Sequence, residues 1–248
     1  MVKALLILVL FNVISVSCAV SAQVNDSDSM LVVTEEWPPY NYSNAAGEIV
    51  GISTEMVEQA LTNVGISYTL SSYPWVRSYE LALNKANVLL FSTVRIPERE
   101  QLFHWVCPLH LVEYSVFKLA TRKDIVINSL SDLKKYSTGI TRGTFLDSFF
   151  EREKLTYGDQ LQVSSNNQVS FQNLINERVD LIIDTPQYID RQLGKLELVP
   201  DYIRSAYKLN GGDSGKMELC MAISLKTPMA LVNKIKAEHQ KLVKAQSD

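Results

Sequence analysis

The sequence predicts an α/β protein built from two successive lobes. Short apolar segments alternate with amphipathic helical segments, and the alternation restarts near residue 114. Such alternation is typical of sheets whose strands are joined by covering helices, with the strands running parallel. Composition agrees, because 46% of the 248 residues are hydrophobic and 21% are charged, which is ordinary for a globular protein.

The first lobe is predicted over residues 30–111. A strand at Met30–Thr34 precedes a loop with two adjacent prolines, which interrupt both helices and sheet ladders. A helix over residues 54–64 keeps its apolar residues on one face, and Gly65 provides its stop. The remaining elements predicted for this lobe are a strand at 67–70, a helix at 76–85 and a strand at 88–91.

The second lobe is predicted over residues 112–215, after a connection that looks ordered rather than flexible. Its strands are predicted at 114–120, 138–141 and 179–183. Its helices are predicted after capping boxes at 129–132 and 144–147, the second helix running to about residue 155, and at 167–177 and 186–193. The helix at 167–177 is expected to bury Val169, Leu174 and Ile175. Residues 216–248 are expected to rejoin the first lobe, with a strand at 219–224 and a helix at 228–245.

Residues 1–22 are predicted to be a cleavable secretory signal. Lys3 precedes a short apolar run, and small residues lead to a cleavage site after Ala22. Residues 23–29 are polar and predicted to be a disordered N-terminus. Because a secretory signal directs export, the mature protein is expected in the periplasm. A buried N-terminal helix and a lipoprotein anchored at Cys18 are the alternatives, and both fit the flanking residues less well.

Charge and motifs exclude several classes of function. With 24 Lys+Arg against 27 Asp+Glu, the formal net charge is −3, and no basic cluster suggests nucleic-acid binding. The chain lacks the P-loop, the dinucleotide-binding glycine pattern and the common hydrolase motifs. We therefore expect no cofactor and no nucleic-acid partner.

The cysteines raise two further questions. His104, Cys107 and His110 have regular spacing, but Pro108 interrupts it and no fourth ligand is apparent, so no metal site is predicted. Cys107 and Cys220 remain after signal cleavage, and an oxidising compartment permits a disulfide between them. Two buried free thiols are the favoured interpretation.

Three segments place aromatic and polar residues where predicted strands end. The first follows the strand at Met30–Thr34 and presents Trp37 and Tyr40. The second combines Trp75 with the run Ser-Thr-Val-Arg-Ile-Pro-Glu-Arg at 92–99. The third belongs to the second lobe and comprises residues 138–144 and 179–186. The candidate ligand-binding residues are Trp37, Tyr40, Trp75, Thr93, Arg95, Arg99, Gly143, Thr144 and Asp184.

In order and spacing, these segments resemble the family 3 extracytoplasmic solute-binding proteins, the amino-acid-binding proteins of bacterial ABC importers. The resemblance covers roughly residues 30–245. It implies a two-lobed periplasmic-binding-protein type II fold, also called a Venus flytrap, which closes on a ligand between its lobes. It also implies a monomer that delivers its small-molecule ligand to an ABC permease or to a sensor.

The resemblance assigns roles to individual residues. Arg99 would hold a ligand carboxylate through its guanidinium fork, together with Gly143 and Thr144 at a helix start. Asp184 would pair with the ligand ammonium, and Trp37 would pack on the ligand. Trp75 would add a second wall, which includes a possible cation–π contact.

Each of these residues also has an ordinary structural interpretation. Arg99 could form a surface ion pair, and Asp184 or Gly143-Thr144 could simply cap helices. Trp37 and Trp75 could be core aromatics, and Arg95 could lie at the surface.

The sequence departs from the family in the segment before Arg99. Val94 and Ile96 stand where most amino-acid binders have small hydroxyl residues, and Arg95 is added. The departure leaves room for a more anionic ligand or one that is not an amino acid. Capture of an amino acid or related small carboxylate, without chemistry, is the leading hypothesis. The alternatives are a dehydratase-like enzyme with Glu35 or Glu36 as its acid–base group, and a stand-alone sensor.

Overall fold

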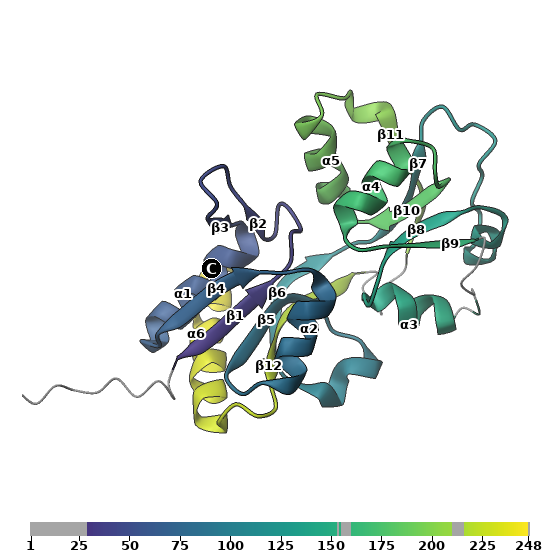
Figure 1. Ribbon diagram of the computed structural model, residues 1–248. Coiled ribbons are helices and arrows are strands. Elements are labelled where there is room, and N and C mark those ends of the chain that lie inside the picture. Colours follow the sequence, from purple (N-terminus) through teal and green to yellow (C-terminus); the bar gives the residue numbers. More distant parts are fainter. Residues whose placement is uncertain (1–28, 153, 155–159, 210–215, 248) are drawn as a thin grey trace, which may run out of the picture.

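The computed structural model describes residues 29–152, 154, 160–209 and 216–247, which form two lobes, each around a five-stranded sheet (Figure 1). The predicted signal peptide and nearly all of the predicted disordered segment lie outside these residues. No helix in the described ranges is long and apolar enough to cross a membrane.

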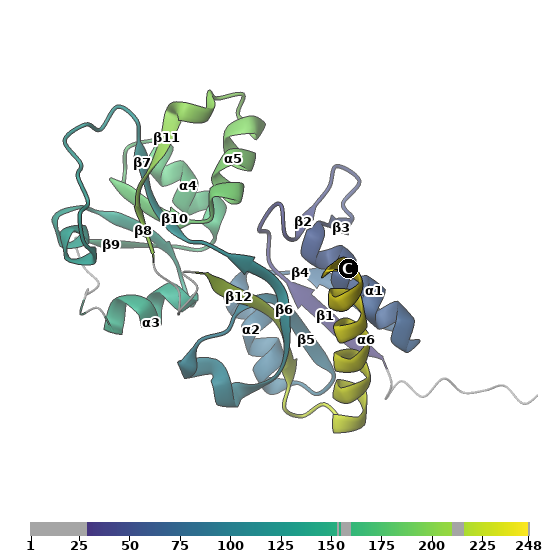
Figure 2. The same cartoon turned by 180° about the vertical axis from the view of Figure 1, so that it is seen from behind.

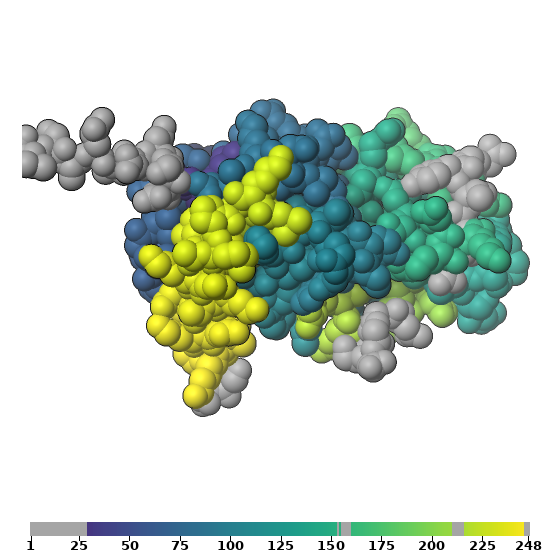
Figure 3. All heavy atoms as spheres, turned by 90° about the horizontal axis from the view of Figure 1, so that it is seen from below, coloured from purple at the N-terminus to yellow at the C-terminus, as the bar shows by residue number. Residues whose placement is uncertain are grey.

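The first lobe contains a sheet of strand order β4-β1-β5-β12-β6. Its strands are β1 (Met30–Thr34), β4 (Tyr68–Ser72), β5 (Val88–Val94), β6 (Phe103–Val112) and β12 (Met217–Ser224). Its helices are α1 (Ile52–Val64), α2 (Trp75–Asn84), the 3₁₀ helix η2 (Pro97–Leu102) and α6 (Met229–Ser247). A two-stranded ribbon, β2 (Tyr42–Ser43) with β3 (Ile49–Val50), extends from it. Helix α6 packs beside α1, on the lobe's outer side when the molecule is viewed from below (Figure 3).

The second lobe has the strand order β11-β7-β10-β8-β9. Its strands are β7 (Ser115–Leu119), β8 (Thr138–Thr141), β9 (Leu161–Ser164), β10 (Leu181–Asp184) and β11 (Ile203–Lys208). Its helices are η3 (Leu130–Lys135), α3 (Phe145–Arg152), α4 (Asn167–Ile175), α5 (Pro186–Lys195) and η4 (Pro200–Tyr202).

Both sheets are mixed, which corrects the expectation of parallel sheets. Strands β1, β4 and β5 are parallel, as are β8, β9 and β10. By contrast, β12 runs antiparallel to β5 and β6, and β7 runs antiparallel to β10 and β11. The alternation of strands with helices reveals only βαβ units, and these antiparallel pairs lie outside such units.

Strands β6 and β12 pair side by side in the first lobe and lead toward the second, as the reverse view shows (Figure 2). A disulfide between Cys107 and Cys220 joins these two strands, so the favoured interpretation of two free thiols is wrong. The cysteines are 113 residues apart in sequence, yet the pairing of β6 with β12 brings their Cα atoms to 4.7 Å. Long-range strand pairing of this kind is not visible in the spacing of the cysteines.

One predicted core position is also wrong. Val169 is 37% exposed, whereas Phe171 and Leu174 of the same helix are buried. The helix begins at its N-cap Asn166, whose side chain accepts a hydrogen bond from the Val169 amide. Ser170 occupies the buried position instead. The helix is therefore rotated by about one residue from the predicted orientation.

The parallel strands of both sheets end at the region between the lobes. The carboxyl ends of β1 and β5 lead into Glu35 and Arg95, and those of β8 and β10 lead into Arg142 and Thr185. In open α/β sheets, this edge is where ligands bind, at the point where the strand order reverses. The fold thus gathers polar residues from distant parts of the chain at a single place.

Candidate functional site

A cavity lies where the two lobes meet, with about 540 Å³ of space free of atoms, including the part open to solvent. Its polar lining comes from both lobes and consists of Glu35, Ser92, Arg99, Thr141, Thr144, Asn167, Ser170 and Asp184. Its apolar and aromatic lining consists of Trp37, Trp75, Val94, Tyr114, Phe145, Leu146, Ile182 and Ile183. Apolar walls combined with convergent polar groups are typical of small-molecule sites, and this cavity has both in equal number.

The loop after β1 positions Glu35 and Trp37. The side chain of Asn41 donates a 2.6 Å hydrogen bond to the Glu35 carbonyl, and the Trp37 amide donates to the Asn41 carbonyl. Gly51 has φ +128°, and a Cβ atom there would lie 2.4 Å from the Tyr40 carbonyl oxygen. Only glycine therefore lets the start of α1 approach the loop and hold it.

Strand β5 carries an irregularity that decides which of its residues reach the cavity. Ser92 has φ 55°, a conformation uncommon outside glycine, and the pairing with β12 shifts register next to it. Ser92 and Val94 line the cavity, whereas the predicted residue Thr93 is fully buried and does not. The Ser92 hydroxyl has no hydrogen-bond partner among the described residues.

Arg99 lies at the cavity in a buried aromatic setting, only 6% exposed. Its guanidinium carbon is 5.1 Å from the Trp75 ring centroid and 5.2 Å from that of Tyr79. The same guanidinium donates to the Val94 carbonyl at 3.3 Å and, across the cleft, to the Gly143 carbonyl at 3.2 Å. Burial lowers the pKa of Arg99, and the nearby side chains of Tyr79, Tyr114, Glu35 and Asp147 only partly oppose this.

Gly143 and Thr144 meet Arg99 and Trp75 from the second lobe. The Trp75 indole donates a 2.5 Å hydrogen bond to the Gly143 carbonyl. The Gly143 amide donates to an Asp147 carboxylate oxygen at 2.6 Å, and the Thr144 hydroxyl donates to the Thr141 carbonyl at 3.0 Å. At the predicted capping box, Asp147 thus binds the amide one residue before Thr144.

Asp184 ends strand β10 and is held across the cleft by Trp37. The Trp37 indole donates a 3.0 Å hydrogen bond to Asp184 Oδ1, and the Thr185 amide donates to the same oxygen at 2.8 Å. Neither bond uses the second carboxylate oxygen. Trp37 and Asp184 come from different lobes, so this bond exists only while the lobes are together.

Glu35 and Asp184 are two buried carboxyl groups that line the same cavity. The pKa of Glu35 is raised to about 8, chiefly by burial and also by the nearby charge of Asp184, while Arg99 opposes both effects. Burial likewise raises the pKa of Asp184 to about 7, against the hydrogen bond from Trp37. Both groups therefore change protonation near neutral pH, where isolated carboxyl groups are fully ionised.

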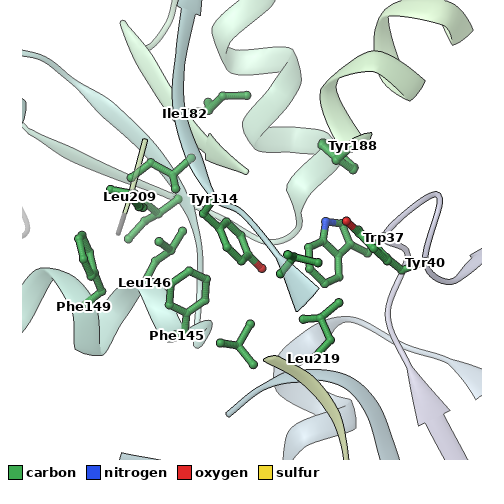
Figure 4. Close-up of a cluster of buried hydrophobic side chains, with 14 of the residues drawn as sticks. Trp37, Tyr40, Tyr114, Phe145, Leu146, Phe149, Ile182, Tyr188, Leu209 and Leu219 are labelled. Atoms are coloured by element: carbon green, nitrogen blue, oxygen red, sulfur yellow. The ribbon is translucent and has the colours of Figure 1, made fainter. Parts of the chain in front are cut away.

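Aromatic rings form one wall of the site (Figure 4). Tyr114, between β6 and β7, stacks on Trp37 with 6.0 Å between centroids and meets Phe145 edge-on at 4.6 Å. In Figure 4, the Tyr114 ring lies between Trp37 of the first lobe and Phe145 of α3. Burial raises the pKa of Tyr114 well above its ordinary value, so the phenol stays neutral.

The predicted residues divide into two groups by position. Trp37, Trp75, Arg99, Thr144 and Asp184 line the cavity, and Gly143 contacts two of them. The others do not line it. Tyr40 is buried behind Trp37, with 4.6 Å between the ring centroids, and Thr93 faces away. Arg95 is at the surface, paired with Glu100.

Several lining residues were not among the predicted ligand-binding residues. Glu35 was considered only as an acid–base group, and Ser92, Tyr114, Asn167 and Ser170 were not singled out as binding residues. Glu35 and Ser92 could have been found from their places at the carboxyl end of a predicted strand. No sequence signal marks Tyr114, whose position depends on the crossing from β6 to β7.

No metal centre is indicated in the described residues. The one group of potential ligand atoms brought together there comprises Cys107, Glu218 and Cys220. Both sulfur atoms of this group are bonded to each other, so they cannot act as thiolate ligands.

Several solved structures share the two-lobed fold of this chain, although no family model matches the chain. An ancestral arginine-binding protein bound to arginine has a TM-score of 0.73 and 16% identity, with coverage of 88% of this chain and 93% of that one. The arginine-, lysine-, histidine-binding protein ArtJ from Geobacillus stearothermophilus has a TM-score of 0.74 and 15% identity, covering 88% and 91%.

A third likeness is to a histidine kinase sensor domain described as similar to periplasmic binding proteins. It has a TM-score of 0.76 at 12% identity and covers 88% of this chain and 92% of that one. At such identities, the likenesses concern the fold. The chain has the two-lobed periplasmic-binding-protein type II fold.

Proposed function

We propose that this chain is an extracytoplasmic solute-binding protein that captures a small polar ligand, an amino acid or a relative of one, by closing its two lobes. The observation that carries the proposal is the Trp37–Asp184 hydrogen bond across a cavity lined by both lobes. Groups that meet only on closure allow a bound ligand to favour the closed state. Arg99 and Trp75, which both donate to Gly143 of the other lobe, strengthen this argument.

An extracytoplasmic location is part of the proposal. The disulfide between Cys107 and Cys220 supports it, because disulfides persist mainly in oxidising compartments. The secretory signal predicted at residues 1–22 points the same way. The ligand would then be passed to a membrane permease or a sensor, and the protein itself would carry out no chemical step.

Ligand-dependent stabilisation tests the function. Residues 23–248 would be unfolded, dialysed to remove co-purified ligand, refolded and heated with amino acids, small organic acids and amines. A ligand at 100 times its Kd stabilises by about 2.7 kcal/mol, which is roughly 5–10 °C in Tm for this size. We expect one chemical class to raise Tm and Asp184→Ala to abolish the shift. A flat response to the whole panel would contradict the proposal.

A second readout follows closure itself. Small-angle scattering with and without the stabilising ligand should report a smaller radius of gyration for the bound protein. Ligand turnover, followed by chromatography of the incubated ligand, would instead favour the enzyme hypothesis with Glu35 as the acid–base group.

A further inference from the structure

The groups expected to bind a ligand carboxylate are already used inside the protein. Arg99 donates to two backbone carbonyls, one of them that of Gly143. The Gly143 amide donates to Asp147, and the Thr144 hydroxyl donates to the Thr141 carbonyl. A carboxylate would have to displace these contacts before it gained hydrogen bonds of its own.

The space beside Arg99 is also taken. The Trp75 ring lies against the guanidinium, and its indole donates to the Gly143 carbonyl. A Cβ atom built on Gly143 would lie only 3.4 Å from Trp75, which measures how closely the two lobes approach there. Val94, the cavity-lining residue of β5 nearest in sequence to Arg99, has no hydroxyl with which to bind an anion.

The other half of the cavity has unused hydrogen-bond acceptors. Glu35 lines the cavity, is only 9% exposed and receives no side-chain hydrogen bond from a described residue. The buried Ser92 hydroxyl also lacks a partner in the described part of the chain. Asp184 receives the bonds from Trp37 and the Thr185 amide on one oxygen, and the Thr185 side chain also interacts with its carboxylate. A buried acceptor without a hydrogen bond costs free energy. A ligand donor that reaches it forms that hydrogen bond and removes the cost.

The charges in the cavity point to the same kind of donor. Two carboxyl groups, Glu35 and Asp184, face one guanidinium, that of Arg99, whose fork is directed at carbonyls. A bound cation would favour the ionised forms of these two carboxyl groups in this low-dielectric setting. An ammonium group supplies three N–H donors for them.

We propose that the cavity binds a small aliphatic amine that lacks a carboxylate, with its ammonium held by Asp184, Glu35 and Ser92. This inference rests on the proposed function and narrows its ligand class from amino acids and their relatives to amines. The methylene chain would lie along Tyr114 and Phe145, which are among the apolar lining residues.

Matched ligand pairs test the inference, because each pair differs only by the carboxylate. Refolded protein would be titrated calorimetrically with lysine and cadaverine, with ornithine and putrescine, and with arginine and agmatine. We expect the amine of at least one pair to bind at least tenfold more tightly than its amino acid. Tighter binding of the amino acids in every pair that binds would overturn the inference and leave the proposed function intact.

Variants locate the binding in the cavity. Asp184→Asn and Glu35→Gln should each weaken the binding of the preferred amine at least tenfold. Glu80→Gln makes the same chemical change on an exposed position of α2 and should leave the affinity within twofold. Urea unfolding of every variant confirms that it folds. If all three variants bind the amine with wild-type affinity, the amine binds elsewhere and the inference is overturned.

The remaining outcomes separate the two proposals. Stabilisation by a small carboxylate, with no response to any amine, would overturn the amine inference and retain a solute-binding function. Absence of binding to any member of the pairs or the wider panel would overturn both.

Discussion

The two halves of the cleft differ in how their polar groups are satisfied. Around Arg99, the guanidinium, the Gly143 amide and the Thr144 hydroxyl each donate to a partner within the protein, and Trp75 closes the space. Beside Asp184, the Glu35 carboxylate and the Ser92 hydroxyl receive no hydrogen bond from the described residues. The first half is built like a closed interface, and the second like a binding site. A shared fold therefore does not fix which end of a ligand is recognised.

The largest expected effect comes from Glu35, which is buried beside Asp184 and Glu36 and opposed by Arg99. Its pKa rises from an unfolded value of 4.5 to about 8, so the folded state binds the extra proton. Stability from this group is fully present below pH 4.5 and is lost as pH rises to about 8. Glu35→Gln should exceed the wild type in free energy of unfolding by about 1 kcal/mol at pH 5 and by about 4–5 kcal/mol at pH 8.5.

Urea unfolding at the two pH values measures this difference. Glu80→Gln is the control, because it makes the same chemical change at an exposed position of α2. If Glu35→Gln changes the free energy of unfolding equally at pH 5 and pH 8.5, Glu35 is not the buried carboxyl group without a partner that distinguishes the two halves of the cleft.

Trp75→Phe tests the closed half. The variant keeps an aromatic ring but removes the indole donor to the Gly143 carbonyl, which retains the bond from Arg99. Loss of one hydrogen bond should lower the free energy of unfolding by about 1 kcal/mol. It should also reduce any preference for amine over amino acid by about fivefold, because the space beside Arg99 opens.

The measurement is urea unfolding together with calorimetric titration of lysine and cadaverine. An unchanged ratio of the two affinities would show that Trp75 does not exclude a carboxylate from that half.

A smaller effect is expected for an ion pair between the lobes outside the cavity. Arg152 of α3 pairs there with Glu98 of the first lobe. Both side chains are more than a third exposed, so solvent and salt screen the pair. A double-mutant cycle with Arg152→Ala and Glu98→Ala should give a coupling of about 0.5 kcal/mol that fades at high salt. A coupling above about 2 kcal/mol would mean that this ion pair, rather than the cavity, holds the lobes together.

Much of the fold could be predicted because its βαβ units are periodic. The helix that ends at Gly65 was expected from its apolar face, and Gly65 adopts the left-handed conformation at its end. Strands β9 and β11 were not predicted, since both lie at sheet edges and expose half of their residues. Apolar runs mark only strands buried on both faces.

The candidate site was predictable only where it follows strand ends. Asp184 and Trp37 come directly after apolar strands, and both line the cavity. Thr93 was expected there instead of Ser92, because a local irregularity such as the positive φ of Ser92 leaves no mark on the sequence. The internal partners of Arg99 likewise depend on contacts between lobes, which a single sequence does not reveal.

The smallest effect is expected for Arg95, which the sequence grouped with Arg99. Its guanidinium pairs with Glu100, and its side chain is 37% exposed outside the cavity. An exposed pair of this kind contributes about 0–1 kcal/mol, so Arg95→Ala should change the free energy of unfolding by about 0.5 kcal/mol or less. The affinity of Arg95→Ala for the stabilising ligand, measured calorimetrically, should stay within twofold of the wild type. Arg99→Ala is measured for comparison, and we expect it to destabilise the closed state because it removes two hydrogen bonds. A large loss of affinity in Arg95→Ala would place ligand recognition outside the cavity and remove the basis for comparing its two halves.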